Sequence, residues 1–208
     1  FPSYLAPAMT QLPELPLTLS RQEIRKMIRQ RRRALTPEQQ QEMGQQAATR
    51  MMTYPPVVMA HTVAVFLSFD GELDTQPLIE QLWRAGTLVY LPVLHPFSAG
   101  NLLFLNYHPQ SELVMNRLKI HEPKLDVRDV LPLSRLDVLI TPLVAFDEYG
   151  QRLGMGGGFY DRTLQTWQHY KTQPVGYAHD CQLVEKLPVE EWDIPLPAVV
   201  TPSKVWEW

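Results

Sequence analysis

Several features that would direct the interpretation of this 208-residue chain are scarce or missing. It has one cysteine, Cys181, which excludes an internal disulfide and a zinc site built from cysteines, and is typical of a reducing cytoplasm. Its formal net charge of −3 creates no strong field for nucleic acid or for an anionic membrane. No apolar run approaches the roughly 20 residues that a membrane-spanning helix needs. We therefore expect a cytoplasmic protein that binds neither nucleic acid nor membranes.

The first 19 residues also lack features of an ordered or exported segment. They include four prolines and no lysine or arginine, so the positive start of a secretory signal is missing. We interpret residues 1–19 as a poorly ordered N-terminal extension. The remaining residues, 20–208, are enough for a single domain with one hydrophobic core.

Two helices are predicted directly after this extension. Ser20 is a suitable N-cap, and apolar residues recur at helical spacing from there to Leu35. Residues 36–39, TPEQ, have the pattern of a second helix start, with a threonine cap, proline at the first position and glutamine three residues after the cap. The basic run at 31–33 has no aromatic residue interleaved with it. We therefore interpret it as a solvated helix face.

From residue 62 onward, apolar runs typical of buried strands alternate with helical patterns. Strands are predicted at 63–67, 88–91 (ended by Pro92), 101–107, 138–141 leading to 143–146, 174–178 and 198–200, and helices at about 76–85 and 160–170. This alternation predicts an open, mostly parallel α/β sheet with helices on both faces, preceded by the two N-terminal helices. Such sheets bind ligands beyond the carboxyl ends of their strands.

The strongest candidate for a binding loop is glycine-rich. Four of the ten glycines fall within residues 154–158, after a predicted strand and before a predicted helix. A simple turn needs only one or two glycines, whereas successive glycines let backbone N–H groups surround an anion. The loop matches neither a P-loop nor a dinucleotide fingerprint, since Phe159 replaces the third glycine. Arg152 and Arg162 flank it and are candidates to clamp phosphate, while Asp161 suits either a helix cap or Mg²⁺.

Two further carboxylates are candidates. Glu72 follows the first buried strand, where it can accept hydrogen bonds from amino or amide groups of a ligand. The neighbouring Asp74 and Thr75 are explained as helix caps, which leaves Glu72 unexplained by the loop alone. Asp193, two residues before Pro195, is on its own a turn residue. The six histidines show no H-x-x-x-H spacing that would indicate zinc.

The segment 144–162, which includes the glycine loop, resembles the signature of the 5-formyltetrahydrofolate cyclo-ligases (methenyltetrahydrofolate synthetases). Four other stretches resemble the same family: the basic helix at 21–35, residues 66–75, residues 175–178 and residues 187–193. Together they extend from residue 20 to residue 201. Arg21 stands where relatives usually have lysine, which exchanges a compact ammonium for a planar guanidinium.

The resemblance implies a ligase of one-carbon metabolism that converts 5-formyltetrahydrofolate and ATP into 5,10-methenyltetrahydrofolate, ADP and phosphate, through phosphorylation of the formyl oxygen. The implied nucleotide-binding residues are Arg21, Arg25, Arg152, Leu153, Gly154, Met155, Gly156, Gly157, Gly158, Phe159 and Tyr160. The implied folate-binding residues are Leu67, Glu72, Met155, Gly156, Gly157, Gly158 and Phe159. The implied cofactor is Mg²⁺, bound by Asp161 and Asp193. We expect a monomer whose only partners are these small molecules.

Without the resemblance, the residues indicate only a phosphate-binding α/β enzyme. A sugar-phosphate isomerase would use the glycine loop for a substrate phosphate and would consume no ATP. A nucleotide sensor would bind ATP without turnover. Mg²⁺-dependent release of ADP that requires 5-formyltetrahydrofolate separates the cyclo-ligase from both alternatives.

Overall fold

The computed structural model describes residues 19–165 and 167–208, so the predicted extension lies outside the described residues except for Leu19. One sheet of eight strands organises the chain, in the spatial order β12-β11-β10-β7-β1-β2-β3-β6. These strands are β1 Thr62–Ala64, β2 Leu88–Leu94, β3 Leu102–Tyr107, β6 Val130–Leu131, β7 Val138–Thr141, β10 Gln173–Tyr177, β11 Ala198–Val200 and β12 Val205–Glu207. The five strands from β11 to β2 run parallel, and antiparallel strands flank them at both ends. The prediction of a mostly parallel sheet is confirmed.

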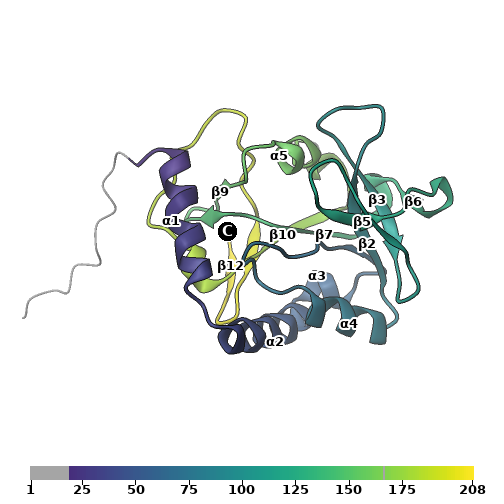
Figure 1. Ribbon diagram of the computed structural model, residues 1–208, viewed down its shortest axis with the longest axis horizontal. Helices are drawn as coiled ribbons and strands as arrows, with labels where there is room; N and C mark the ends of the chain where they lie inside the picture. Colours follow the sequence, from purple (N-terminus) through teal and green to yellow (C-terminus); the bar gives the residue numbers. More distant parts are fainter. Residues whose placement is uncertain (1–18, 166) are drawn as a thin grey trace, which may run out of the picture.

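Helices cover both faces of this sheet, as predicted. The helices are α1 Arg21–Arg33, α2 Pro37–Thr53, α3 Pro55–Val58, α4 Gln76–Arg84 and α5 Phe159–Leu164, with short 3-10 turns η1 Val127–Asp129, η2 Leu133–Arg135, η3 Trp167–His169 and η4 Asp180–Gln182. Helices α2, α3 and α4 lie along one face and share a buried core with the central strands (Figure 1). Leu164 of α5 belongs to a second buried cluster on the opposite face. Within the described ranges, none of the helices combines the length and apolar character that crossing a membrane requires.

The starts of the first two helices follow from local sequence. The hydroxyl of Ser20 accepts a hydrogen bond from the backbone N–H of Glu23 at 3.1 Å. At the start of α2, the backbone N–H of Gln39 donates to the hydroxyl of Thr36 at 3.1 Å, and the side chain of Gln39 accepts from the N–H of Thr36 at 2.9 Å. Each cap satisfies N–H groups that have no partner within the helix. Both predicted helix starts are therefore confirmed.

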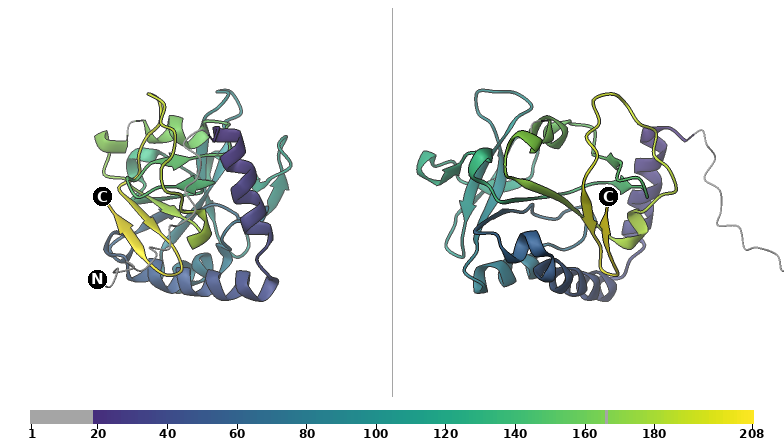
Figure 2. Two further views of the ribbon diagram at one scale, coloured as in Figure 1. Left: turned by 90° about the vertical axis from the view of Figure 1, so that its left-hand side faces the viewer. Right: turned by 180° about the vertical axis from the view of Figure 1, so that it is seen from behind.

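Helix α1 packs beside the main sheet rather than on it (Figure 2). Its buried residues Ile24 and Ile28 belong to a third cluster, with residues of the small sheet formed by β8 Ala145–Phe146 and β9 Arg152–Leu153. The interpretation of residues 31–33 as a solvated face is wrong for Arg32, whose exposed fraction is only 2%. Arg32 is buried because the loop after β1 packs over it, a contact between segments about 40 residues apart.

The sequence predicted that the strand beginning at Leu88 ends at Pro92. This prediction is wrong, because β2 continues to Leu94. Its pairing with the parallel strand β1 ends at Tyr90, whose carbonyl accepts from the N–H of Val65 at 2.9 Å. The backbone hydrogen-bonding groups of strand residues two apart, such as Tyr90 and Pro92, point toward the same neighbouring strand. The N–H that proline lacks would therefore point toward β1, where that ladder has already ended. The antiparallel strand β3 pairs on the other side through Leu94 and keeps β2 extended.

Of two further helical predictions, the cap before the helix at 76–85 is confirmed for Asp74 but not for Thr75, and the helix at 160–170 is shorter than predicted. The N-cap position of α4 is Thr75, but its hydroxyl donates to the carbonyl of Phe66 at 2.7 Å, and the helix cap comes from Asp74, which accepts from the N–H of Gln76 at 3.0 Å. The predicted helix at 160–170 is α5, which spans only Phe159–Leu164, followed by η3. Sequence patterns also missed β6, β12 and the hairpin of β4 Leu113–Met115 with β5 His121–Pro123.

Candidate active site

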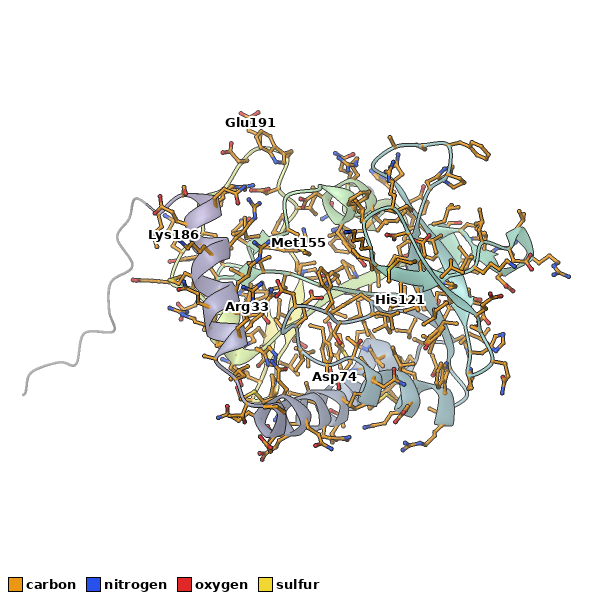
Figure 3. All side chains as sticks on the ribbon, in the orientation of Figure 1. Arg33, Asp74, His121, Met155, Lys186 and Glu191 are labelled. Atoms are coloured by element: carbon orange, nitrogen blue, oxygen red, sulfur yellow. The ribbon has the colours of Figure 1, made fainter. Side chains whose placement is uncertain are left out.

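A cavity of about 790 Å³ opens where the parallel strands β1 and β7 end. Its walls come from segments distant in sequence: α1, the ends of β1 and β2, the β4–β5 hairpin, the glycine loop with α5, and the segment that contains Trp192 and Asp193. Figure 3 shows Met155 of the glycine loop between α1 and α5, with His121 of β5 further along toward the hairpin. The cavity thus lies beyond the carboxyl ends of the strands, where we expect a ligand to bind.

The cavity brings together nearly all the residues that the sequence nominated. The residues that line it are Arg21, Arg25, Leu67, Glu72, Arg152, Gly154, Met155, Gly156, Gly157, Gly158, Phe159, Tyr160, Asp161 and Asp193. Leu153 is not among them. Its side chain is 1% exposed and packs in the cluster beneath α1, while its backbone pairs with Ala145.

The glycine loop adopts a backbone that other residues tolerate poorly. Gly156 has φ of +105° and Gly158 has φ of +71°, so both occupy the region that L side chains rarely adopt. Gly158 also caps α5 in the left-handed conformation. A Cβ at Gly158 would lie 2.8 Å from Nη1 of Arg162. Glycine is therefore favoured at both positions by the backbone conformation, and at Gly158 a side chain would also displace the guanidinium of Arg162.

Two buried arginines lie against the glycine loop. Arg25, 7% exposed, donates from Nε to the carbonyl of Gly154 at 2.8 Å. Arg152, also 7% exposed, donates from Nη1 to Asp161 at 2.9 Å and from Nε to the carbonyl of Pro142 at 3.3 Å. Loss of hydration lowers the pKa of both guanidinium groups, but arginine starts so far above neutrality that both stay cationic. The cavity therefore has fixed positive charges suited to phosphate.

Arg162 connects the glycine loop with the loop between β2 and β3. Its Nη2 donates to the carbonyl of Gly157 at 2.6 Å, and its Nε donates to the carbonyl of Gly100 at 2.5 Å. The guanidinium also lies 5.5 Å from the ring centroid of Phe159. The sequence nominated this arginine as a phosphate clamp, but the structure engages it with two backbone carbonyls.

Both carboxylates that the sequence nominated for Mg²⁺ are paired with arginines. Asp161 forms an ion pair with Arg152, and Asp193 forms one with Arg21 while accepting from the N–H of Glu190 at 2.8 Å. Among the described residues, no three His, Cys, Asp or Glu side chains gather into a metal site. Magnesium is commonly held by one or two carboxylates together with phosphate oxygens and waters. Two carboxylates in one cavity suit an ion that arrives with a phosphorylated ligand.

Glu72 lines the cavity with a carboxyl group whose pKa is strongly shifted. Loss of hydration raises the pKa of this group from 4.5 to about 7, and the charge of Asp70 adds to the rise. A hydrogen bond from the N–H of Phe69 at 3.1 Å and the cation of Arg32 act in the opposite direction. Near neutral pH, Glu72 therefore exists in both protonation states. A group that binds beside it can shift the balance between these states.

One wall of the cavity, formed by the β4–β5 hairpin, was not predicted from the sequence. Asn116, Ile120 and Glu122 line the cavity there, and Glu122 accepts hydrogen bonds from the N–H of Leu94 at 3.1 Å and from the amide of Asn116 at 3.0 Å. Strands of three residues are too short for a clear alternation of apolar and polar residues. The available signal was weak: the short apolar run at 113–115 is followed by the mostly polar stretch at 116–119, NRLK, but the second strand, HEP, is not apolar.

Comparisons with known proteins give matches in both sequence and structure. A sequence model of the 5-formyltetrahydrofolate cyclo-ligase family matches residues 18–202. The chain is 98% identical over 182 residues to the 5-formyltetrahydrofolate cyclo-ligase of Escherichia coli (strain K12), covering 88% of this chain and 100% of that protein. It is 52% identical over 179 residues to the protein of the same name from Haemophilus influenzae, covering 86% and 96%. The NMR structure of Aquifex aeolicus 5,10-methenyltetrahydrofolate synthetase matches with a TM-score of 0.77 at 28% identity, covering 91% of this chain and 93% of that one.

Proposed function

Because this chain belongs to the 5-formyltetrahydrofolate cyclo-ligase family, and is thus a cyclo-ligase, we propose that it closes the ring of 5-formyltetrahydrofolate with cleavage of ATP. The products are 5,10-methenyltetrahydrofolate, ADP and phosphate, and Mg²⁺ is required. The name of the Aquifex synthetase supports the methenyl product. The same proposal includes a monomeric, cytoplasmic enzyme with one domain over residues 20–208.

The observation that carries the proposal is the composition of the cavity described above. Its volume of about 790 Å³ lies in the upper part of the range that small-molecule sites occupy. Arginines and a glycine loop suited to phosphates share this space with the partly protonated Glu72 and with apolar side chains such as Phe66 and Leu91. A reaction between a polyanionic nucleotide and a heterocyclic substrate needs both kinds of wall in one place.

The chemistry explains why a nucleotide is needed. The formyl group on N5 is an amide, so its carbon is a poor electrophile and its oxygen a poor leaving group. The formyl oxygen attacks the γ-phosphorus of ATP, the bond to ADP breaks, and the formyl carbon becomes an activated imidate-type phosphate. N10 of the same molecule then attacks this carbon, the carbon–oxygen bond breaks with release of phosphate, and N10 loses its proton. The second step is intramolecular and therefore entropically favoured.

The protein residues of the cavity divide between the two substrates. Arg21, Arg25 and Arg152, with the N–H groups of the glycine loop, bind the phosphates and balance their negative charge. The two carboxylates that now pair with arginines, Asp161 and Asp193, hold Mg²⁺, which neutralises phosphate charge when it is bound. When nucleotide is bound, Arg21 and Arg152 would pair with its phosphates, and Asp161 and Asp193 would be free to hold the metal.

The folate lies toward Leu67 and Glu72 in this proposal. Oε1 of Glu72 accepts the N–H of Phe69, while Oε2 forms no hydrogen bond within residues 19–165 and 167–208. That second oxygen is thus available to accept from the amino and ring N–H groups of a pterin. Residues 155–159 lie between the two binding regions and contact both ligands.

The decisive experiment follows the near-ultraviolet absorbance of the methenyl product after the protein is mixed with 5-formyltetrahydrofolate, ATP and Mg²⁺. We expect product only when all four components are present, with one ADP released per product. Nucleotide binding without turnover would indicate the sensor, and product formation independent of ATP would contradict the proposed chemistry. Asp193→Asn is expected to raise the Mg²⁺ concentration needed for half-maximal rate.

A further inference from the structure

Glu72 ends a tight turn that has an unusual backbone. Asp70 has φ of +51° and Gly71 has φ of +75°, so both central residues of the turn at 69–72 lie in the left-handed region, as in a type I′ turn. The N–H of Glu72 donates to the carbonyl of Phe69 at 3.0 Å, and the Glu72 carboxylate accepts from the N–H of Phe69 at 3.1 Å. The position of the Glu72 carboxylate is therefore determined by this turn.

Arginines of α1 converge on the turn. Nε and Nη2 of Arg33 donate to Oδ1 of Asp70 at 3.0 and 2.8 Å. On the other carboxylate oxygen, Oδ2, Nη2 of Arg32 lies at 3.7 Å and Nε of Arg29 at 3.8 Å. Arg29 and Arg33 are partly solvated, with exposed side-chain fractions of 39% and 64%, whereas Arg32 is at 2%. Arg32 is thus the one buried cation of the group.

The turn is also held at its glycine. A Cβ at Gly71 would lie 3.2 Å from Cβ of Arg32, so the backbone packs directly on that side chain. The carbonyl of Gly71 accepts from Nε2 of Gln40 at 3.1 Å and lies 3.2 Å from Nε2 of His179. Because a carbonyl only accepts, Nε2 is the protonated nitrogen of this buried histidine. Three distant segments therefore meet at one turn.

This arrangement is less favourable in free energy than a loop with ordinary backbone angles and no buried charge. The left-handed region is uncommon for non-glycine residues, although aspartate tolerates it better than most. A buried arginine without a full set of partners is also unfavourable, and within the described residues Nε of Arg32 has none. Natural proteins tend to retain such features where they serve a site.

We propose that Arg32 and Asp70 are positioning residues, which fix the turn at 69–72 and so direct the Glu72 carboxylate toward the folate. The inference rests on the proposed function, because the contact of Glu72 with folate is part of that proposal. Neither Arg32 nor Asp70 is among the residues that line the cavity. They act through the backbone that carries Glu72, and Arg32 also supplies a cation that favours the ionised carboxylate.

The test uses the full chain and the variants Asp70→Asn, Arg32→Met and Arg32→Lys, with Arg84→Met as control. Arg84 is an exposed arginine that pairs with Glu80 at 3.7 Å on α4, so it undergoes the same chemical change away from the turn. We expect Asp70→Asn and Arg32→Met to raise KM for folate about tenfold, the effect of losing one hydrogen bond to a charged group. KM for ATP changes by less than about twofold, and Arg32→Lys retains part of the folate affinity.

A second readout is independent of activity. Amide hydrogen exchange of residues 69–72 should be faster in Asp70→Asn than in the parent chain, and unchanged in Arg84→Met. The inference would be overturned if exchange at residues 69–72 in Asp70→Asn were no faster than in the parent chain. It would also be overturned if exchange were faster while KM for folate stayed unchanged. If Arg32→Met fails to fold, Asp70→Asn and Gly71→Ala carry the test, since the latter strains the same turn.

A double-mutant cycle separates this inference from the proposed function. In the background of Glu72→Gln, Asp70→Asn should raise KM for folate little further, because both changes affect one contact. Full additivity would overturn the positioning role while leaving the reaction intact. If instead Glu72→Gln alone leaves folate binding unchanged, the assignment of Glu72 to folate is wrong. Absence of turnover in the parent chain would contradict the proposed function itself.

Discussion

At the scale of single residues, the carboxyl group of Glu72 serves the proposed binding site but lowers the stability of the fold at neutral pH. Its carboxyl group loses hydration in the cavity, and its pKa rises from 4.5 to about 7. The folded state therefore holds its proton more tightly than the unfolded chain does. Since the unfolded chain releases this proton at lower pH, the free energy of unfolding decreases as the pH rises from about 4.5 to 7.

The variant Glu72→Gln should remove this effect. We expect it to be more stable than the parent chain by roughly 1–2 kcal/mol at pH 8, with little difference at pH 4.5. Urea denaturation at the two pH values measures it. A destabilised variant at pH 8 would show that the carboxylate is better solvated than its environment indicates.

Deprotonation of Glu72 should raise the affinity for folate, although it lowers the free energy of unfolding. An ionised carboxylate only accepts hydrogen bonds, and protonation turns one of its oxygens into a donor, which removes part of its capacity to accept from a pterin. KM for folate should therefore rise as the pH falls through about 7. Glu72→Gln should show a raised KM that changes little between pH 6 and pH 8. The charged groups that act on Glu72 are Arg32 and Asp70, and Arg32→Met should move the transition to higher pH.

At the scale of elements, Arg162 of α5 joins two loops that sequence alone does not place together. Gly100 and Gly86 allow a matched test, because their φ values are +81° and +78°. A Cβ at Gly100 would lie 2.6 Å from Nη2 of Arg162, whereas a Cβ at Gly86 has nothing within 4 Å. Alanine at either position carries the same backbone strain.

Gly100→Ala and Gly86→Ala should each lower the free energy of unfolding by about 1 kcal/mol through this strain. Only Gly100→Ala should also raise KM for the substrates, because it displaces the guanidinium that holds the glycine loop at Gly157. Denaturation and steady-state kinetics on both variants measure the two effects. Equal kinetic changes in the two variants would refute the role of Arg162.

The elements that sequence predicted well are those with local causes. The caps at Ser20 and Thr36 satisfy N–H groups of their own helices, so a few adjacent residues contain the whole signal. Pro92 was misleading because the effect of a missing N–H depends on which neighbour it faces. That neighbour, β1, is about 25 residues away in sequence, and its early end is not visible in a local pattern.

The candidate site likewise has features that could be predicted from the sequence and features that could not. The glycine loop and Glu72 were recognisable, since a plain turn or helix cap requires neither four clustered glycines nor a carboxylate at those positions. The pairs of Asp161 with Arg152 and of Asp193 with Arg21 were not, although all four residues had been nominated. Arg32 was assigned to solvent because a charge run usually is solvated, and its burial depends on the turn at 69–72.

At the scale of the whole molecule, the site depends on how α1 docks. Ile28 of α1 and Ile79 of α4 are both fully buried, but they belong to different hydrophobic clusters. Replacing either by alanine leaves a cavity of similar size, with an expected cost of about 2–4 kcal/mol. Only Ile28 supports the helix that carries Arg25 to the carbonyl of Gly154.

Ile28→Ala should therefore raise KM for ATP severalfold, whereas Ile79→Ala should leave it near the value of the parent chain. Thermal denaturation of both variants establishes that their stability losses are comparable, and kinetics below the midpoint then isolates the docking effect. If Ile79→Ala raised KM for ATP equally, a general loosening of the fold would account for both changes.

The contacts along α1 have one more consequence. Arg25 reaches the glycine loop and Arg32 reaches the turn of Glu72, and seven residues of helix separate them by about 10 Å on one face. A continuous helix thus connects the region proposed for nucleotide with that proposed for folate. Any cooperativity that it transmits is reciprocal: the factor by which nucleotide changes the affinity for folate equals the factor by which folate changes the affinity for nucleotide.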